Sequence, residues 1–248
     1  MIEQTTDNDI VTLTLNHGKA NAADIEMLAA LSQTFAELSE ARAVILTSSG
    51  SIFSAGVDLA RLVKGGRAYA AEFGPLLDRV IREIFAFPAP LITAVNGHAI
   101  AGGCMFAVAG DYRIMARGKG RIGAPELMVS VPFPMAPLEL MRFAMPRQHL
   151  QKHLYSGETL LADDAVSKGL IDEACEADQL MERAQRMAAK LGGIDRKNFR
   201  LTKAMLRDES LQRMHDAAER FNPEVFARWA EQDTLDGIQR YMDKLAGG

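Results

Sequence analysis

The sequence has few of the features that mark several specialised protein classes. Its 248 residues include only two cysteines, Cys104 and Cys175, and no C-x-x-C spacing. This scarcity argues against a disulfide framework and against a metal site, and two thiols fit a reducing compartment. The first residues, MIEQTTDNDI, lack the basic patch and apolar run of a signal peptide. We therefore expect a cytoplasmic protein.

Charge of one sign and long apolar runs are also missing. The chain has 28 basic and 32 acidic residues, a net charge of -4, which gives no broad electrostatic case for a nucleic acid or a membrane surface as partner. The most apolar stretch, residues 90–109, is interrupted by Asn96, His98 and several glycines and prolines, so it is expected to be a buried core segment. A hydrophobic content of 48% is that of an ordinary globular chain with a sizeable core.

Short apolar runs alternate with helical patterns in the first part of the chain. Strands are predicted at residues 10–15, 43–47, 91–95 and 112–116, and helices at 25–38, 69–87 and 104–109. Asp111, between the last of these helices and the next strand, is expected to pair with Arg113 or to cap backbone. Strand, glycine-rich loop and helix in repeated order predict an α/β fold built from β–α units.

The pattern becomes mostly helical after about residue 146. Helices are predicted at residues 163–168, 177–191, 196–207 and 211–245. We place a domain boundary near residue 190, with a core at 1–190 and a helical module at 191–248 that packs on the core or on a neighbouring subunit.

Three short segments carry residues suited to chemistry. In IFSAGVDL (residues 52–59), Asp58 opens a predicted helix, so the segment is either a plain N-cap or a helix start whose free N–H groups, that of Val57 included, point at an anion. In NGHAIAGGCM (residues 96–105), Gly102 and Gly103 either present a free N–H or only permit tight packing. In RIGAPEL (residues 121–127), Glu126 is either a solvated surface carboxylate or a desolvated proton shuttle.

Taken together and in this order, these segments resemble the crotonase superfamily, the enoyl-CoA hydratase/isomerase family. The resemblance starts at LNHGKANA (residues 15–22), passes through FSAGVDL, AIAGGCM, DYRIMA and IGAPEL, and ends at DTLDGIQRYMDK (residues 233–244). It implies a crotonase-like ββα spiral core with a helical C-terminal region, assembled as a homotrimer or a dimer of trimers. It also implies an acyl-CoA thioester as substrate, with coenzyme A as part of that substrate and no separate cofactor.

The resemblance also assigns roles to residues. The catalytic set that it implies is the N–H groups of Val57 and Gly102, which hold the thioester oxygen as an enolate, and the Glu126 carboxylate. Lys244, on the last helix, corresponds to residues that often reach the CoA phosphates. The full set of residues expected to bind the substrate or its CoA portion is Ala20, Ala22, Ala55, Gly56, Asp58, Leu59, Gly103, Met105, Pro125 and Lys244.

One difference from the family's hydratases favours a particular reaction. Those enzymes usually carry two glutamates, and this chain has Glu126 at one position but Met105 at the other. A single carboxylate suits a proton shuttle that moves a double bond, so we expect a Δ3,Δ2-enoyl-CoA isomerase. The alternatives are a hydratase or a related lyase or hydrolase, and, in a different class, a non-catalytic acyl-CoA-binding subunit. Phe53, Phe73, Phe133 and Met135 are candidates for shaping the acyl pocket.

Overall fold

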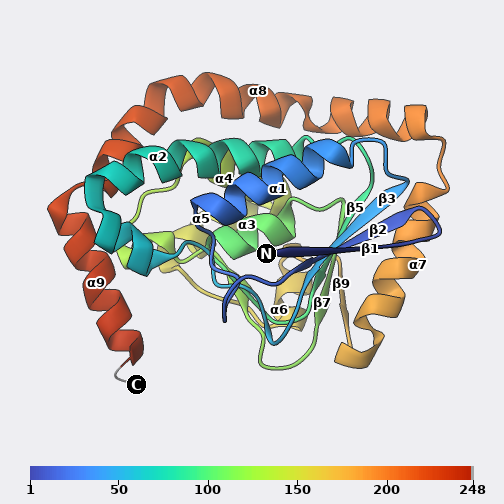
Figure 1. The fold of residues 1–248 in the computed structure, drawn as a ribbon, viewed down its shortest axis with the longest axis horizontal. Coiled ribbons are helices and arrows are strands. Elements are labelled where there is room, and N and C mark those ends of the chain that lie inside the picture. Colours follow the sequence, from blue (N-terminus) through green and yellow to red (C-terminus); the bar gives the residue numbers. More distant parts are fainter. Residues whose placement is uncertain (247–248) are drawn as a thin grey trace.

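The structure, a computed structural model, describes residues 1–246 and is built from a spiral of strand–strand–helix turns (Figure 1). In chain order its elements are β1 (Ile2–Asp7), β2 (Ile10–Leu15), α1 (Ile25–Glu37), β3 (Ala43–Ser48), β4 (Ile52–Ser54), α2 (Leu59–Phe85), β5 (Leu91–Val95), β6 (His98–Ile100), α3 (Gly102–Val108), β7 (Tyr112–Ala116), β8 (Ile122–Gly123), the 3-10 helix η1 (Glu126–Val129), α4 (Met135–Ala144), α5 (Arg147–Ser156), α6 (Ala162–Ser167), β9 (Glu173–Cys175), η2 (Ala177–Gln179), α7 (Leu180–Gly192), α8 (Arg196–Trp229) and α9 (Gln232–Ala246).

Two sheets divide the strands of each turn between them. The larger sheet has the order β1-β2-β3-β5-β7-β9, and all its pairs are parallel except β1 with β2. The smaller sheet has the order β4-β6-β8 and is parallel throughout. After the β1–β2 pair, which lies wholly in the large sheet, the strands β3, β5 and β7 lie in the large sheet and the strand that follows each of them, β4, β6 or β8, lies in the small one. This arrangement confirms the predicted α/β spiral with a helical C-terminal region.

The central strands β3 and β5 of the large sheet are buried on both faces, which explains why they are apolar runs instead of alternating patterns. Val44 and Leu46 of β3 belong to the main core, in which α1, α2 and α3 take part. Ala43 and Ile45 point to the opposite face, where they pack against Ala184 and other small or apolar residues of α7. In Figure 1, α7 lies beyond the sheet on the side away from α1 and α2.

The long helix α8 holds the helical C-terminal region on the core. It runs along the length of the molecule beside α2 (Figure 1) and packs against both α2 and α4. The predicted break between residues 207 and 211 is wrong, because α8 continues to Trp229 and the chain turns only before α9. Strand β9 lies in the region after residue 146, which was predicted to be mostly helical, and it was not predicted. None of the helices within residues 1–246 has the length and apolar character needed to span a bilayer.

Candidate active site

The small sheet brings the three sequence segments to one place. Because β4, β6 and β8 are adjacent and parallel, their carboxyl ends lie at the same edge. Val57 follows β4, Gly102 follows β6 and Glu126 follows β8, each within three residues of the strand end. Ligands of parallel sheets bind outside the carboxyl ends of the strands. Residues about 45 and 70 positions apart in sequence thus meet because of strand order.

The turn after β4 is held on one side by backbone hydrogen bonds with Ala23. Ala23 N–H donates to Gly56 O at 2.6 Å, and Asp58 N–H donates to Ala23 O at 2.9 Å, which makes a parallel bridge between Ala23 and Val57. In such a bridge the amide of the residue between the two bonds points to the opposite side. The Val57 N–H therefore faces away from Ala23. Asp58 caps α2 by accepting the Arg61 N–H at 2.9 Å, as the sequence predicted.

The turn after β6 packs its backbone directly on the first. Ala101 has φ 52° and ψ -122°, an unfavourable region for a residue with a Cβ, and α3 begins immediately after it. Gly56 has φ 84°, and a Cβ there would lie 2.9 Å from Gly102 N. A Cβ on Gly103 would lie 2.2 Å from Ser54 O. Both glycines are therefore required for the close approach of the two turns.

Two free N–H groups result from this approach. A Cβ built on Gly102 would make an ordinary contact of 3.8 Å with Val57 N, so the two amides lie close together. Within residues 1–246, neither the Val57 N–H nor the Gly102 N–H donates a hydrogen bond. Both Val57 and Gly102 line the same cavity. A ligand oxygen placed there would find two backbone donors.

Glu126 lies buried at the start of η1, and only 9% of its surface is exposed. Its Oε2 atom has no hydrogen-bond partner in residues 1–246. Loss of solvation raises the pKa of Glu126 to about 8, against a slight lowering by its own backbone N–H. A carboxyl group with a pKa near neutral can both take up and release a proton at physiological pH.

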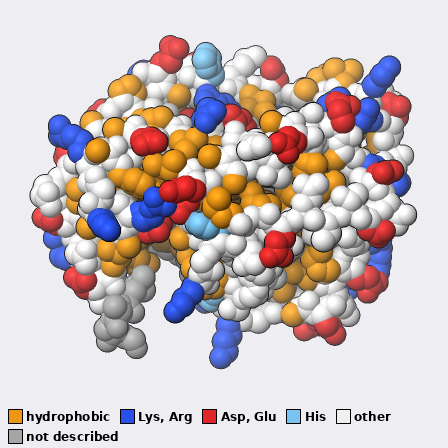
Figure 2. Space-filling model, viewed as in Figure 1, with side chains coloured by type: hydrophobic (Ala, Val, Ile, Leu, Met, Phe, Trp, Pro, Cys, Tyr) orange, Lys and Arg blue, Asp and Glu red, His pale blue; other side chains and the backbone are white. Residues whose placement is uncertain are grey.

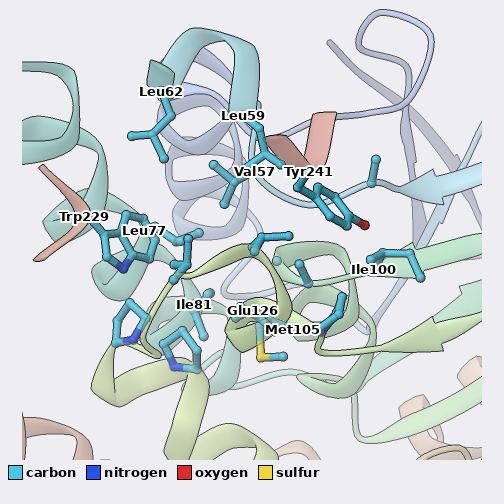
Figure 3. Close-up of a pocket in the computed structure, with 18 residues that line it drawn as sticks. Val57, Leu59, Leu62, Leu77, Ile81, Ile100, Met105, Glu126, Trp229 and Tyr241 are labelled. Carbon is cyan, nitrogen blue, oxygen red and sulfur yellow. The ribbon is translucent and has the colours of Figure 1, made fainter. Parts of the chain in front are cut away.

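One cavity of about 70 Å³ contains much of the predicted site (Figure 3). The predicted residues that line it are Ala55, Val57, Leu59, Gly102, Met105, Pro125 and Glu126. The other predicted residues lie outside its wall: Ala20, Ala22, Gly56, Asp58, Gly103 and Lys244. Ala20 accepts the Ala55 N–H at 2.9 Å, so it lies directly behind the first turn. Lys244 is exposed on α9, one turn after Tyr241, which does line the cavity.

The remaining wall was not predicted from the sequence. It comes from α2, the end of β6 with the turn after it, the chain around η1 and α4, and the C-terminal helices: Leu62, Leu77, Ile81, Ile100, Ala101, Val129, Val131, Pro134, Pro137, Trp229 and Tyr241. The expectation that Phe53, Phe73, Phe133 and Met135 shape this cavity is wrong, since none of them lines it. Helical periodicity showed that α2 has a buried face, but no local signal tells which buried residues face a cavity.

Comparisons with known proteins agree with this architecture. The family model described as enoyl-CoA hydratase/isomerase matches residues 5–247. A crotonyl-CoA hydratase of Syntrophomonas wolfei is 30% identical over 95% of this chain and 92% of its own length. A short-chain-enoyl-CoA hydratase of Clostridium acetobutylicum is 27% identical over 95% of this chain and 92% of its own length.

A solved structure gives the same fold over almost the whole chain. Human mitochondrial delta3-delta2-enoyl-CoA isomerase superposes with a TM-score of 0.94 at 22% identity, covering 99% of this chain and 98% of its own. These matches confirm the resemblance found in the sequence: the chain belongs to the enoyl-CoA hydratase/isomerase family.

Proposed function

We propose that this enzyme is a Δ3,Δ2-enoyl-CoA isomerase, which moves the double bond of a 3-enoyl-CoA into conjugation with the thioester. The observation that carries the proposal is the composition of the cavity wall, on which Glu126 is the only carboxylate among the described residues. Moving a double bond needs one group that removes a proton from C2 and returns one at C4. Adding water is helped by a second group that handles the water.

In the proposed mechanism, the N–H groups of Val57 and Gly102 bind the thioester oxygen. Removal of a C2 proton leaves a dienolate whose negative charge lies largely on that oxygen. Fixed backbone donors stabilise this charge without reorganising, and each contributes roughly 3 kcal/mol in comparable sites. The close approach of the two turns, which Gly56 and Gly103 permit, is what holds both donors on one side of the cavity.

The Glu126 carboxylate is the proposed proton shuttle. It takes the C2 proton as the C2–H electron pair forms the C1–C2 bond of the dienolate. The same carboxyl group then gives the proton to C4, the C3–C4 double bond is lost and the C2–C3 double bond forms. No other reactant is needed. The apolar wall around Glu126 keeps water from taking the proton and supports its return to carbon.

Hydration of a 2-enoyl-CoA is the second candidate, and the two relatives named as hydratases favour it. Met105 argues against it, since it lines the cavity where the resemblance places the second hydratase glutamate and a thioether transfers no proton. Two other side chains on the wall carry a polar hydrogen, Trp229 and Tyr241, and the indole N–H of Trp229 already donates to Pro132 O at 2.9 Å. The polar hydrogen of Tyr241 belongs to its hydroxyl group. Its hydroxyl points toward Ile100 and away from Glu126 in Figure 3, a poor position for activating water at the same carbons.

The CoA portion is proposed to lie over the first turn. Ala20, Ala22 and Ala55 have small side chains on neighbouring strands of backbone, tied by the bond between Ala55 N–H and Ala20 O. Small residues let a ligand approach the main chain closely. Lys244 is proposed to contact the CoA phosphates. Its exposed position on α9, beyond Tyr241 at the cavity, is consistent with this role.

A homotrimer is the proposed assembly. Cyclic trimers need two different patches that meet in each interface. Exposed apolar side chains that could supply them are Leu201, Met205 and Leu206 on α8, Phe143 on α4, Leu127 and Met128 of η1, and Leu161. On the face shown in Figure 2, apolar side chains gather between interspersed charges of both signs. Light scattering on a gel-filtration column tests the trimer, and Met205→Glu should shift the mass toward that of a monomer.

The deciding experiment offers the purified protein 3-enoyl-CoA and 2-enoyl-CoA in separate assays. The proposal expects a rise in thioester–enone absorbance with the 3-enoyl-CoA, faster than any fall with the 2-enoyl-CoA. A faster fall with the 2-enoyl-CoA would make the protein a hydratase. Binding of both thioesters with no turnover of either would make it a non-catalytic acyl-CoA-binding subunit.

A further inference from the structure

One end of the cavity is closed by an aromatic side chain that the mechanism does not use. Trp229, the last residue of α8, lies on one side of Glu126, while Tyr241 and Ile100 lie on the other (Figure 3). Leu77 and Ile81 of α2 flank the path between Glu126 and the indole. An acyl chain that extends from the thioester past Glu126 in this direction meets the indole ring.

The indole is held in place from several directions. Its side chain is 2% exposed, and its Nε1–H donates to Pro132 O at 2.9 Å. The Phe73 ring stacks on it with centroids 6.3 Å apart, and the Phe226 ring meets it edge-on at 6.4 Å. Phe226 in turn packs against Gly74, where a Cβ would lie 2.6 Å from the Phe226 ring. Trp229 is therefore a rigid wall, because moving it requires breaking a hydrogen bond and repacking α2 against α8.

The cavity is also small. Its volume of about 70 Å³ is well below the roughly 300–1,000 Å³ of pockets that hold drug-sized ligands. Glu126 is the only charged side chain on its wall among residues 1–246, and Leu62, Leu77 and Ile81 lie on the side toward Trp229 (Figure 3). Such a wall suits an unsubstituted aliphatic chain and offers no hydrogen bond to a hydroxylated one.

We propose that Trp229 sets the length of the acyl group, so that the enzyme acts on short aliphatic acyl-CoA thioesters of about four to six carbons. This inference rests on the proposed function only in taking acyl-CoA as the ligand of the cavity. It does not depend on which reaction follows.

The experiment uses the fact that Trp229 is the sole tryptophan of the chain, so intrinsic tryptophan fluorescence reports on this wall alone. Saturated thioesters that cannot react, butyryl-CoA, hexanoyl-CoA and decanoyl-CoA, are titrated into the wild-type protein, with free CoA as reference. We expect butyryl-CoA and hexanoyl-CoA to change the emission and free CoA to leave it unchanged. Decanoyl-CoA should bind at least tenfold more weakly than hexanoyl-CoA, because its tail has no room.

Variants then test the wall by calorimetric titration, which needs no tryptophan. Trp229→Ala, and to a smaller degree Trp229→Phe, should bring decanoyl-CoA to the affinity of hexanoyl-CoA. Phe221→Ala is the matched control, since it removes an exposed aromatic side chain from the same helix but not from the cavity, and it should keep the wild-type preference. If wild-type protein binds decanoyl-CoA as tightly as hexanoyl-CoA, Trp229 does not limit the chain.

The same measurements separate this inference from the proposed function. Chain-length-dependent binding without isomerase turnover would contradict the isomerase and leave the role of Trp229 intact. Isomerase turnover with equal kcat/KM for 3-hexenoyl-CoA and 3-decenoyl-CoA would contradict the role of Trp229 and leave the isomerase intact.

Discussion

Glu126 and Asp111 are both largely buried carboxylates, but their surroundings are opposite. Asp111, just before β7, accepts hydrogen bonds from Lys203 at 2.6 Å, from Arg207 at 2.8 Å and from the Leu91 N–H at 2.8 Å. Both cationic side chains are also buried, and they bond to backbone carbonyls of Ala89 and Phe85. Glu126 has neither a cation nor a partner for Oε2 within residues 1–246.

The difference distinguishes a structural carboxylate, Asp111, from the carboxyl group for which we propose a proton-transfer role, Glu126. At Asp111 the charges are compensated, and the network joins α8 to the sheet. Even there, burial lowers the pKa of Lys203 to about 8, with Asp111 acting in the opposite direction. At Glu126 nothing compensates the carboxylate, so the proton stays available for exchange. A buried carboxyl group with an unpartnered Oε2, on the same cavity as free N–H donors, is the feature on which the proposed active site rests.

The largest effect is expected from Glu126→Gln. This change keeps the shape of the side chain and removes its ability to carry a proton, so kcat should fall by roughly 10²- to 10⁴-fold. Turnover of a 3-enoyl-CoA is the measurement, with binding of a saturated acyl-CoA as the control for folding. Full turnover in this variant would show that Glu126 is a buried structural residue, as Asp111 is.

Asp111→Asn should mainly affect stability. It leaves Lys203 and Arg207 buried without their anion, a loss that typically costs about 3–5 kcal/mol. Urea unfolding of wild type and variant measures this. Asp163→Asn is the control, because Asp163 pairs with Arg117 at an exposed site where the expected loss is at most about 1 kcal/mol. Equal losses in both variants would contradict the structural role of the buried network.

The pH dependence of Glu126 should have a defined sign. Its folded pKa of about 8 lies above its value in the unfolded chain, so the folded protein binds more protons between these two values. The contribution of Glu126 to stability is therefore fully present below the unfolded pKa and is lost as pH rises through about 8. Glu126→Gln should remove this slope, a difference of a few kcal/mol by pH 8.

The activity should also depend on the ionisation of Glu126, but it should rise with pH where the stability falls. The base must be ionised, so kcat/KM of the wild-type enzyme should rise with pH and level off above about pH 8. A profile that is flat between pH 6 and 9 would mean that the group removing the C2 proton is not this carboxyl.

The smallest effect is expected from Met105→Glu. It adds a second carboxyl group to the cavity wall and makes the site more like that of the family's hydratases. We expect hydration of a 2-enoyl-CoA to rise by about tenfold, an effect limited by the absence of other water-binding groups. Met105→Gln is the uncharged control. A rise of the same size in both variants would show that polarity, and not proton transfer, is what the site lacks.

The sequence predicted four of the longer strands, and it missed the short strands together with some longer elements. The four predicted strands correspond to β2, β3, β5 and β7. Strands β4, β6, β8 and β9 were not predicted, because two or three residues in a strand leave no periodic signal. The edge strand β1 and the helices α4 and α5 were also not predicted. The small sheet that positions Val57, Gly102 and Glu126 is made of three of these short strands, so the geometry of the site was the least readable part.

The partners of buried side chains were also poorly predicted where they lie far away in the sequence. Asp111 was expected to pair with Arg113, two residues away, or to cap backbone. It does accept the Leu91 N–H, but Arg113 pairs with Asp172, while the cations on Asp111 come from α8. Partners more than 90 residues away depend on how helices pack, and no local pattern records that.

The sequence by itself determined the family, the α/β spiral and the three segments that meet at the site, because glycine turns, apolar runs and motif order are local properties. Only the tertiary structure decided that Oε2 of Glu126 has no hydrogen-bond partner within residues 1–246 and that Trp229 and Tyr241 lie on opposite sides of Glu126 in its cavity. Burial and pairing depend on which distant segments come into contact. In this protein, the parallel order of β4, β6 and β8 and the packing of α8 and α9 on the core decide which side chains are buried and which are paired.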